Sequence, residues 1–140
     1  MSKPATGPPQ RDHLVVLIQR SREDAHRLIE AFRHADARAH VEWFACPEEA
    51  KKYLFEAATR RAPPDLVLAE DEAIGRVKLI GRIREDRRLK YVPFIVLTRE
   101  PVIPVAVEAG GVSLYVRRPA RPEDADALVA TLSRVLPISG

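Results

Sequence analysis

Polar and charged side chains follow four of the five short apolar stretches that have the composition of buried strands in this 140-residue chain. They are Gln19 and Arg20, Glu70 and Asp71, Thr98 and Arg99, and the run Arg117-Arg118-Pro119. Neighbouring carboxylates are the groups that hold a hard cation, and arginine guanidinium groups pair with carboxylates or phosphates. The candidate chemistry therefore lies where the strands end, if these strands are parallel.

The elements that would position these side chains alternate along the sequence. Apolar runs predict strands at residues 14–18, 41–44, 66–69, 94–97 and 114–116. Amphipathic segments predict helices at 21–34, 47–58, 77–83 and 122–136, with a short helical turn at 102–109. Ser21 offers a hydroxyl cap for the first helix, and Pro47 and Pro122 open the second and the last.

This alternation predicts an α/β fold, doubly wound, in which helices cover both faces of a parallel sheet. Each parallel pairing needs a right-handed crossover, and the predicted helices supply it. In such sheets ligands bind outside the carboxyl ends of the strands. The strand ends that carry Glu70 and its neighbours are therefore the expected site.

Composition excludes several classes of protein. With 46% hydrophobic residues, 31% charged residues and no apolar run near the roughly 18 residues of a membrane span, we expect a cytoplasmic, globular chain without a membrane partner. The single cysteine precludes an internal disulfide, and no cysteine or histidine cluster has zinc-ligand spacing. We expect one domain over residues 13–137, a flexible leader over 1–12 and a tail over 138–140.

From about Leu14 to Leu136 the chain resembles the receiver domain of two-component response regulators. The segments that carry the likeness are Pro-Glu-Glu-Ala-Lys-Lys-Tyr-Leu (47–54), Pro-Asp-Leu-Val-Leu-Ala-Glu (64–70), Ile-Arg-Glu-Asp-Arg-Arg-Leu-Lys-Tyr-Val-Pro-Phe-Ile-Val-Leu-Thr (83–98), Glu-Ala-Gly (108–110) and Tyr-Val-Arg-Arg-Pro (115–119). The resemblance implies a flavodoxin-like (βα)5 fold with strand order 2-1-3-4-5. It is strongest to the small stand-alone regulators, since no output domain follows the last helix.

The resemblance also implies a set of site positions. A working receiver holds Mg²⁺ with two acids after the first strand and accepts phosphate on an aspartate that ends the third. A hydroxyl after the fourth strand and a lysine before proline after the fifth complete its pocket. Carried over to this sequence, the acid pair falls on Gln19 and Arg20, the acceptor on Glu70, the hydroxyl on Thr98, the switch aromatic on Tyr115 and the lysine on Arg118. Only Thr98 and Tyr115 match.

The departures from this pattern predict a pseudo-receiver, a receiver-like domain that neither binds Mg²⁺ nor accepts phosphate on an aspartate. An arginine and a neutral amide do not replace two carboxylates, so no Mg²⁺ and no other cofactor is expected. Glu70 reaches one methylene further than aspartate, which upsets the geometry of phosphoryl transfer. We expect Arg20 or Arg118 to form a bidentate pair with Glu70 and to hold one conformation.

Two alternatives stay open at these positions. Glu70 and Asp71 could be solvated loop acids without a role. The chain could also be a phosphorylation-competent regulator that accepts phosphate from a histidine kinase at Asp71 or at Glu70. Alternation along a strand aims Asp71 away from the direction of Glu70 unless the strand has ended or bulges.

The expected activity is protein binding and not enzymatic catalysis. The resemblance implies a face built from the fourth helix, fifth strand and fifth helix, and its candidate residues are Val102, Ile103, Leu114 and Tyr115. The expected partner is another signalling protein, a histidine kinase or a downstream effector, and a second copy of the chain is an alternative. The cations between Arg76 and Lys90 could bind a phosphate backbone, but no aromatic residues interleave with them, so nucleic acid is not the expected partner.

Overall fold

Five parallel strands form one sheet in the computed structural model, which describes residues 13–35, 39–60, 63–71, 79–99 and 114–135. From one edge to the other they are β2 (Ala39–Phe44), β1 (His13–Ile18), β3 (Leu66–Glu70), β4 (Phe94–Thr98) and β5 (Leu114–Arg117). Every described pairing between neighbouring strands is parallel. The doubly wound α/β class and the order 2-1-3-4-5 are confirmed.

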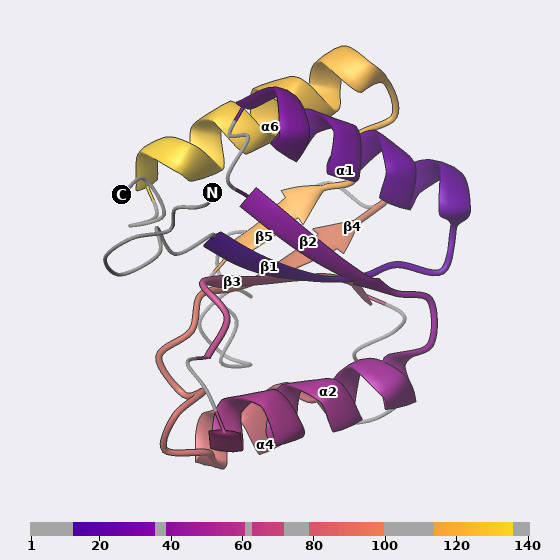
Figure 1. The fold of residues 1–140 in the computed structure, drawn as a ribbon. Helices are drawn as coiled ribbons and strands as arrows, with labels where there is room; N and C mark the ends of the chain where they lie inside the picture. Colours follow the sequence, from indigo (N-terminus) through magenta and orange to yellow (C-terminus); the bar gives the residue numbers. More distant parts are fainter. Residues whose placement is uncertain (1–12, 36–38, 61–62, 72–78, 100–113, 136–140) are drawn as a thin grey trace, which may run out of the picture.

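Helices cover both faces of this sheet (Figure 1). On one face lie α1 (Arg22–Ala35) and α6 (Pro122–Val135), and on the other lie α2 (Pro47–Arg60) and α4 (Leu79–Glu85). Because side chains alternate along a strand, Val15 and Leu17 pack toward α1 and α6, while Val16 and Ile18 pack into the cluster with α2 and α4. β1 is therefore buried on both faces, as its uniformly apolar sequence predicts.

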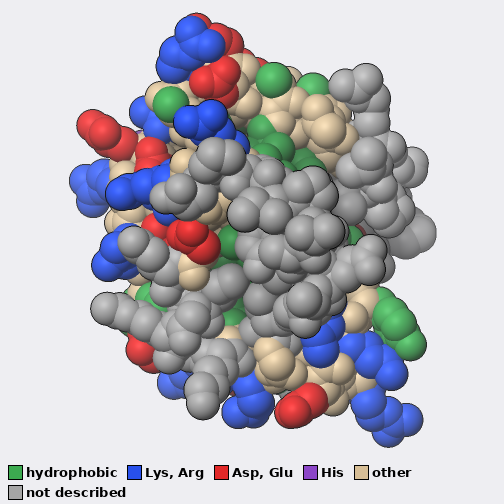
Figure 2. Space-filling view, turned by 180° about the vertical axis from the view of Figure 1, so that it is seen from behind, with side chains coloured by type: hydrophobic (Ala, Val, Ile, Leu, Met, Phe, Trp, Pro, Cys, Tyr) green, Lys and Arg blue, Asp and Glu red, His purple; other side chains and the backbone are tan. Residues whose placement is uncertain are grey.

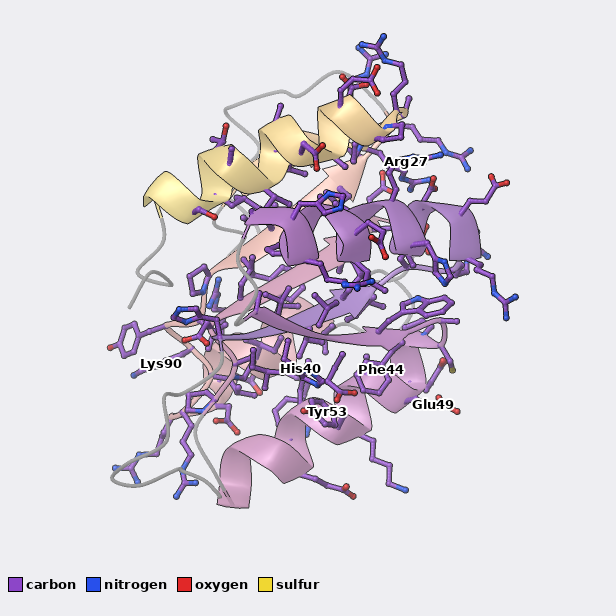
Figure 3. All side chains as sticks on the ribbon, turned by 45° about the horizontal axis from the view of Figure 1, so that its top comes forward. Arg27, His40, Phe44, Glu49, Tyr53 and Lys90 are labelled. Carbon is purple, nitrogen blue, oxygen red and sulfur yellow. The ribbon has the colours of Figure 1, made fainter. Side chains whose placement is uncertain are left out.

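The predicted boundaries agree with the described elements to within about two residues. Ser21 caps α1 as expected, because its Oγ accepts the backbone N–H of Asp24 at 3.2 Å. Phe44 of β2 and Tyr53 of α2 pack with ring centroids 5.0 Å apart and ring planes tilted by 44°, and this contact joins the helix to the sheet (Figure 3). The leader, the tail, the start of the predicted third helix and the turn at 102–109 lie outside the described residues.

Three cations of the basic segment near α4 have specific partners within the fold. The Arg84 guanidinium donates to the backbone oxygens of Lys90 at 2.6 Å and Val92 at 3.1 Å, and so fastens the loop before β4. Arg82 lies over the Phe55 ring, and Lys90 lies 5.1 Å from the centroid of the Tyr91 ring, which is 82% exposed. The exposed ring of Tyr91 thus lies directly after the basic segment, next to its last cation, Lys90.

A search of the described helices finds none with the length and apolar character of a membrane span.

Candidate functional site

The register of the sheet brings the predicted site residues to one edge. Ile18 of β1 lies opposite Ala69 of β3, so Gln19 and Glu70 are the next residues along these neighbouring strands. Glu70 itself lies opposite Leu97, one residue before Thr98. Parallel strands end at the same edge, so these side chains share one surface of the sheet.

Glu70 is buried between two arginines. The residue is 2% exposed, and its Oε1 accepts the backbone N–H of Arg20 at 2.8 Å and lies 3.4 Å from Arg20 Nε. Its Oε2 accepts a hydrogen bond from Arg118 Nη2 at 3.3 Å. The carboxylate thus forms an arginine bridge, the set Arg20, Glu70 and Arg118. The predicted bidentate pair with one arginine is wrong, because each oxygen faces a different guanidinium group.

Arg118 is held on several sides, with only 9% of its side chain exposed. Its backbone N–H donates to the Thr98 oxygen at 2.7 Å, which fixes where the side chain starts. Its Nη1 lies 4.0 Å from Asp24 Oδ2. Its Nε is buried and has no hydrogen-bond partner among the described residues. The bridge therefore leaves part of this guanidinium group unused.

Asp71 joins the same cluster, contrary to the direction expected from alternation. Strand pairing ends at Glu70, so the alternation of faces no longer applies to the next residue. The Asp71 Oδ1 lies 3.7 Å from Arg118 Nη2, and 39% of its side chain is exposed. Asp71 is therefore partly solvated, whereas the expectation of a solvated loop acid is wrong for Glu70.

Gln19 is fully buried and held mainly by its backbone. Its N–H donates to the Phe44 oxygen at 3.1 Å, and its own oxygen accepts the indole N–H of Trp43 at 2.7 Å. The side-chain Oε1 accepts the Ser21 N–H at 3.5 Å, while Nε2 has no partner within the described part of the chain. The Trp43 contact was not predicted, because nothing in a short strand indicates where an indole N–H will point.

The predicted switch and interface residues are only partly described. Thr98 is buried at the end of β4. The backbones of Leu114 and Tyr115 lie in β5, where Tyr115 is opposite Val96, but their side chains are outside the described part. Val102 and Ile103 lie outside the described residues altogether.

Beside the bridge lies an open cavity that was not predicted from the sequence. Its volume is about 370 Å³, and it is lined by Asp24, Arg27, Arg99, Arg117, Arg118, Pro119 and Ala120. We call it the arginine hollow. Arg99 and Arg117 were noted as residues at strand ends, and that shared position was the signal that could have found it. Lys and Arg side chains surround the acidic ones along this edge of the molecule, at the left of Figure 2.

Solved structures supply a comparison for this arrangement. The chain superposes on the phosphorylated cyanobacterial phytochrome response regulator RcpA with a TM-score of 0.72, at 20% identity, over 89% of this chain and 98% of the other. It has the receiver fold. Two further response regulators have the same fold. The Vibrio cholerae chemotaxis response regulator CheY4 superposes with a TM-score of 0.67 at 22% identity, over 89% of this chain and 98% of the other. HP1043, an orphan response regulator of H. pylori, superposes with a TM-score of 0.68 at 19% identity, over 90% of this chain and 98% of the other.

The sequence comparisons find no match, either to a family model or to a curated protein. The likeness to receivers therefore lies in the fold. The arginine bridge of this receiver-like domain occupies the strand ends where the resemblance places a receiver's phosphate pocket.

Proposed function

We propose that this chain is an atypical stand-alone regulator of signal transduction, a pseudo-receiver that binds another protein without Mg²⁺-dependent aspartyl phosphorylation. The receiver fold and the similarity to response regulators support its place in signalling. The arginine bridge supports the absence of the phosphorylation step.

The observation that carries the proposal is the burial of Glu70 with both carboxylate oxygens engaged. A phosphate acceptor must present an oxygen to the donor in line with the leaving group. Here Oε1 faces Arg20 and Oε2 faces Arg118, so attack would require breaking the bridge. The fixed negative charge of Glu70 takes the place of a charge that phosphorylation would add.

The residues at the strand ends do not fit Mg²⁺. A hard dication needs several oxygen ligands, usually carboxylates. The two positions after β1 hold a buried amide, Gln19, and the cation Arg20, whose Nε is 3.4 Å from the nearest Glu70 oxygen. In the described part of the chain no three His, Cys, Asp or Glu side chains are grouped to hold a metal. A divalent cation would meet positive charge at this edge.

The proposed partner is another signalling protein, a histidine kinase or a downstream effector. The proteins of similar structure are themselves response regulators, which supports a partner of this class. A second copy of the chain is the alternative partner.

Intact-mass spectrometry after incubation with acetyl phosphate, with and without Mg²⁺, tests the proposal. Because Glu70 is bridged, we expect no covalent phosphoryl adduct in either condition. A Mg²⁺-dependent adduct would overturn the proposal.

A second candidate is a phosphorylation-competent regulator that uses Asp71. It is favoured by the position of that carboxylate, which is 39% exposed and 3.7 Å from Arg118 Nη2. If this candidate is correct, the adduct forms in the native chain and in Glu70→Gln, and is lost in Asp71→Asn. Loss of the adduct in Glu70→Gln alone would place the acceptor on Glu70 instead.

A further inference from the structure

We propose that the arginine hollow binds a phosphate-class oxyanion reversibly, without covalent transfer. The inference goes beyond the proposed function and rests on it only through Arg118, which belongs to both the bridge and the hollow. A receiver's pocket is built to gather a cation and a phosphoryl group around an aspartate. This hollow would take the anion alone.

The fold brings the arginines of the hollow together from three elements. Arg117 ends β5 opposite Thr98, so Arg99, the residue after Thr98, lies on the adjacent strand end. Arg118 follows Arg117 directly. Arg27 comes from α1 and lies at the opposite end of the sheet from Lys90 (Figure 3).

Among the described residues of the bridge and the hollow, positive charges outnumber negative ones. The bridge and the hollow together contain the cations Arg20, Arg27, Arg99, Arg117 and Arg118 and the acids Asp24, Glu70 and Asp71. Arg27 is neutralised by Asp24, with Nη1 to Oδ1 at 2.7 Å. Arg99 and Arg117 are exposed and form no ion pair with a described residue. The two excess positive charges therefore lie in the hollow.

Donors remain for a ligand. A guanidinium group carries five N–H donors, and the side chain of Arg118 makes one hydrogen bond within the described part, the 3.3 Å contact with Glu70. Its Nε has no partner there although the side chain is more than nine-tenths buried. Buried donors of this kind normally have an acceptor. An anion in the hollow would supply acceptor oxygens to a guanidinium group that the bridge uses only in part.

The ligand class follows from the arrangement of donors. A carboxylate has only two oxygens, which a single guanidinium fork or two separate arginines can engage. A tetrahedral phosphate group presents at least three acceptor oxygens, which suits arginines that approach from α1 and from the ends of β4 and β5. The volume of about 370 Å³ accepts inorganic phosphate or a small phosphate ester, near the lower end of the range of ligand cavities.

The test is a two-dimensional NMR titration of the full chain with inorganic phosphate, without Mg²⁺, against sodium chloride at matched ionic strength. We expect saturable shifts at the amides of Arg99, Arg117 and Ala120 with phosphate and not with chloride. Arg99→Ala and Arg117→Ala should each weaken binding about tenfold, the effect of losing one charge-assisted contact. Arg87→Ala, an exposed arginine in the loop before β4, is the matched control and should bind as the native chain does.

A second arm with phosphoserine distinguishes the two sources of the phosphate group. Tighter binding of phosphoserine assigns the ligand to a phosphorylated partner or metabolite, and tighter binding of inorganic phosphate assigns it to the free ion. Equal shifts with chloride, or unchanged affinity in the double variant Arg99→Ala/Arg117→Ala, would overturn the inference. Because both substitutions are at exposed side chains, a folding failure is not expected.

The phosphate titration and the phosphorylation experiment test separate claims. The hollow predicts reversible binding that needs no Mg²⁺ and leaves the mass of the chain unchanged. A covalent, Mg²⁺-dependent adduct would refute the pseudo-receiver proposal and leave the hollow intact, whereas the absence of phosphate binding would refute only the hollow.

Discussion

At the scale of single residues, the main finding is that a buried carboxylate is shared by two arginines. A charge taken out of water is stabilised only when paired and hydrogen-bonded. Glu70 meets this condition through Arg20 and Arg118, and Arg118 depends on Glu70 in return. Removing the charge of Glu70 or of Arg118 would therefore leave the other as a buried, incompletely paired ion.

Glu70→Gln should therefore destabilise the domain. Removing one partner of a buried ion pair costs about 3–5 kcal/mol, and we expect about 2 kcal/mol here because Arg20 is half exposed and Asp71 stays near Arg118. Urea denaturation measures the loss. Glu123→Gln, in a side chain 70% exposed at the start of α6, is the control and should change the unfolding free energy by less than about 0.5 kcal/mol. Equal stability of Glu70→Gln and the native chain would refute a structural role for the bridge.

The sequence indicated which residues meet at this edge, but not how they meet. Strand ends place Glu70, Arg20 and Arg118 together because their positions follow from the alternation of strands and helices. Which oxygen each guanidinium faces depends on side-chain rotamers and on the register between β4 and β5. The Trp43 hydrogen bond to Gln19 and the hollow around Arg99 depend on the same tertiary detail.

At the scale of the elements, boundaries were predicted well where a residue type marks them. Ser21 before α1, Pro47 at the start of α2 and Pro122 at the start of α6 are such markers. The end of β3 has no marker, because Glu70 and Asp71 are both acids that either a strand or a loop accepts. The predicted direction of the Asp71 side chain depended on that one residue, because Asp71 faces Arg118 only if the strand ends at Glu70.

The cap of α1 gives a prediction at this scale. Ser21→Ala removes the acceptor of the Asp24 N–H and should cost about 1 kcal/mol of unfolding free energy. Because α1 begins next to Arg20, the same substitution should broaden the NMR signals of residues 20–24. Ser133→Ala, in the last turn of α6, is a matched control and should cost less than about 0.5 kcal/mol. Similar losses in the two variants would contradict the assigned cap.

The start of α6 gives a prediction about pH. A hydrogen bond from the Arg121 side chain lowers the pKa of Asp124 below its ordinary value. A lowered pKa in the folded state means that the contribution to stability is present above the unfolded pKa and is lost as pH falls through the folded pKa. An NMR titration of the Asp124 carboxyl should show this depression, and Arg121→Gln should reduce it, because the backbone hydrogen bonds to the carboxylate remain. An unchanged Asp124 pKa in that variant would refute the assigned cause.

At the scale of the whole molecule, the chain has the receiver fold, and arginines are prominent at the carboxyl ends of its strands. The net charge of +3 arises from 23 basic and 20 acidic residues. Among the described residues of the bridge and the hollow, five arginines lie with three acids. Such an edge repels a divalent cation and attracts an anion. The fold was predictable because it depends on the pattern of apolar residues, and the charged residues at the strand ends could be read from the sequence directly.

Mg²⁺ should accordingly have no effect on the thermal stability of the native chain. A site filled one hundredfold above its Kd would add about 2.7 kcal/mol, which a melting experiment detects. The variant Gln19→Asp/Arg20→Asp/Glu70→Asp restores the acids of a receiver and should gain a Mg²⁺-dependent rise in Tm. A rise in the native chain would contradict the assignment of these positions.

The most direct test of the central claim is an NMR titration of the native chain with beryllofluoride, with and without Mg²⁺. Beryllofluoride stands in for the phosphoryl group on a carboxylate. If the bridge holds one conformation, the amides of residues 70, 71 and 98 stay unchanged by the addition of Mg²⁺. A saturable, Mg²⁺-dependent shift at those amides would show that the phosphorylation switch still works, and would contradict the account.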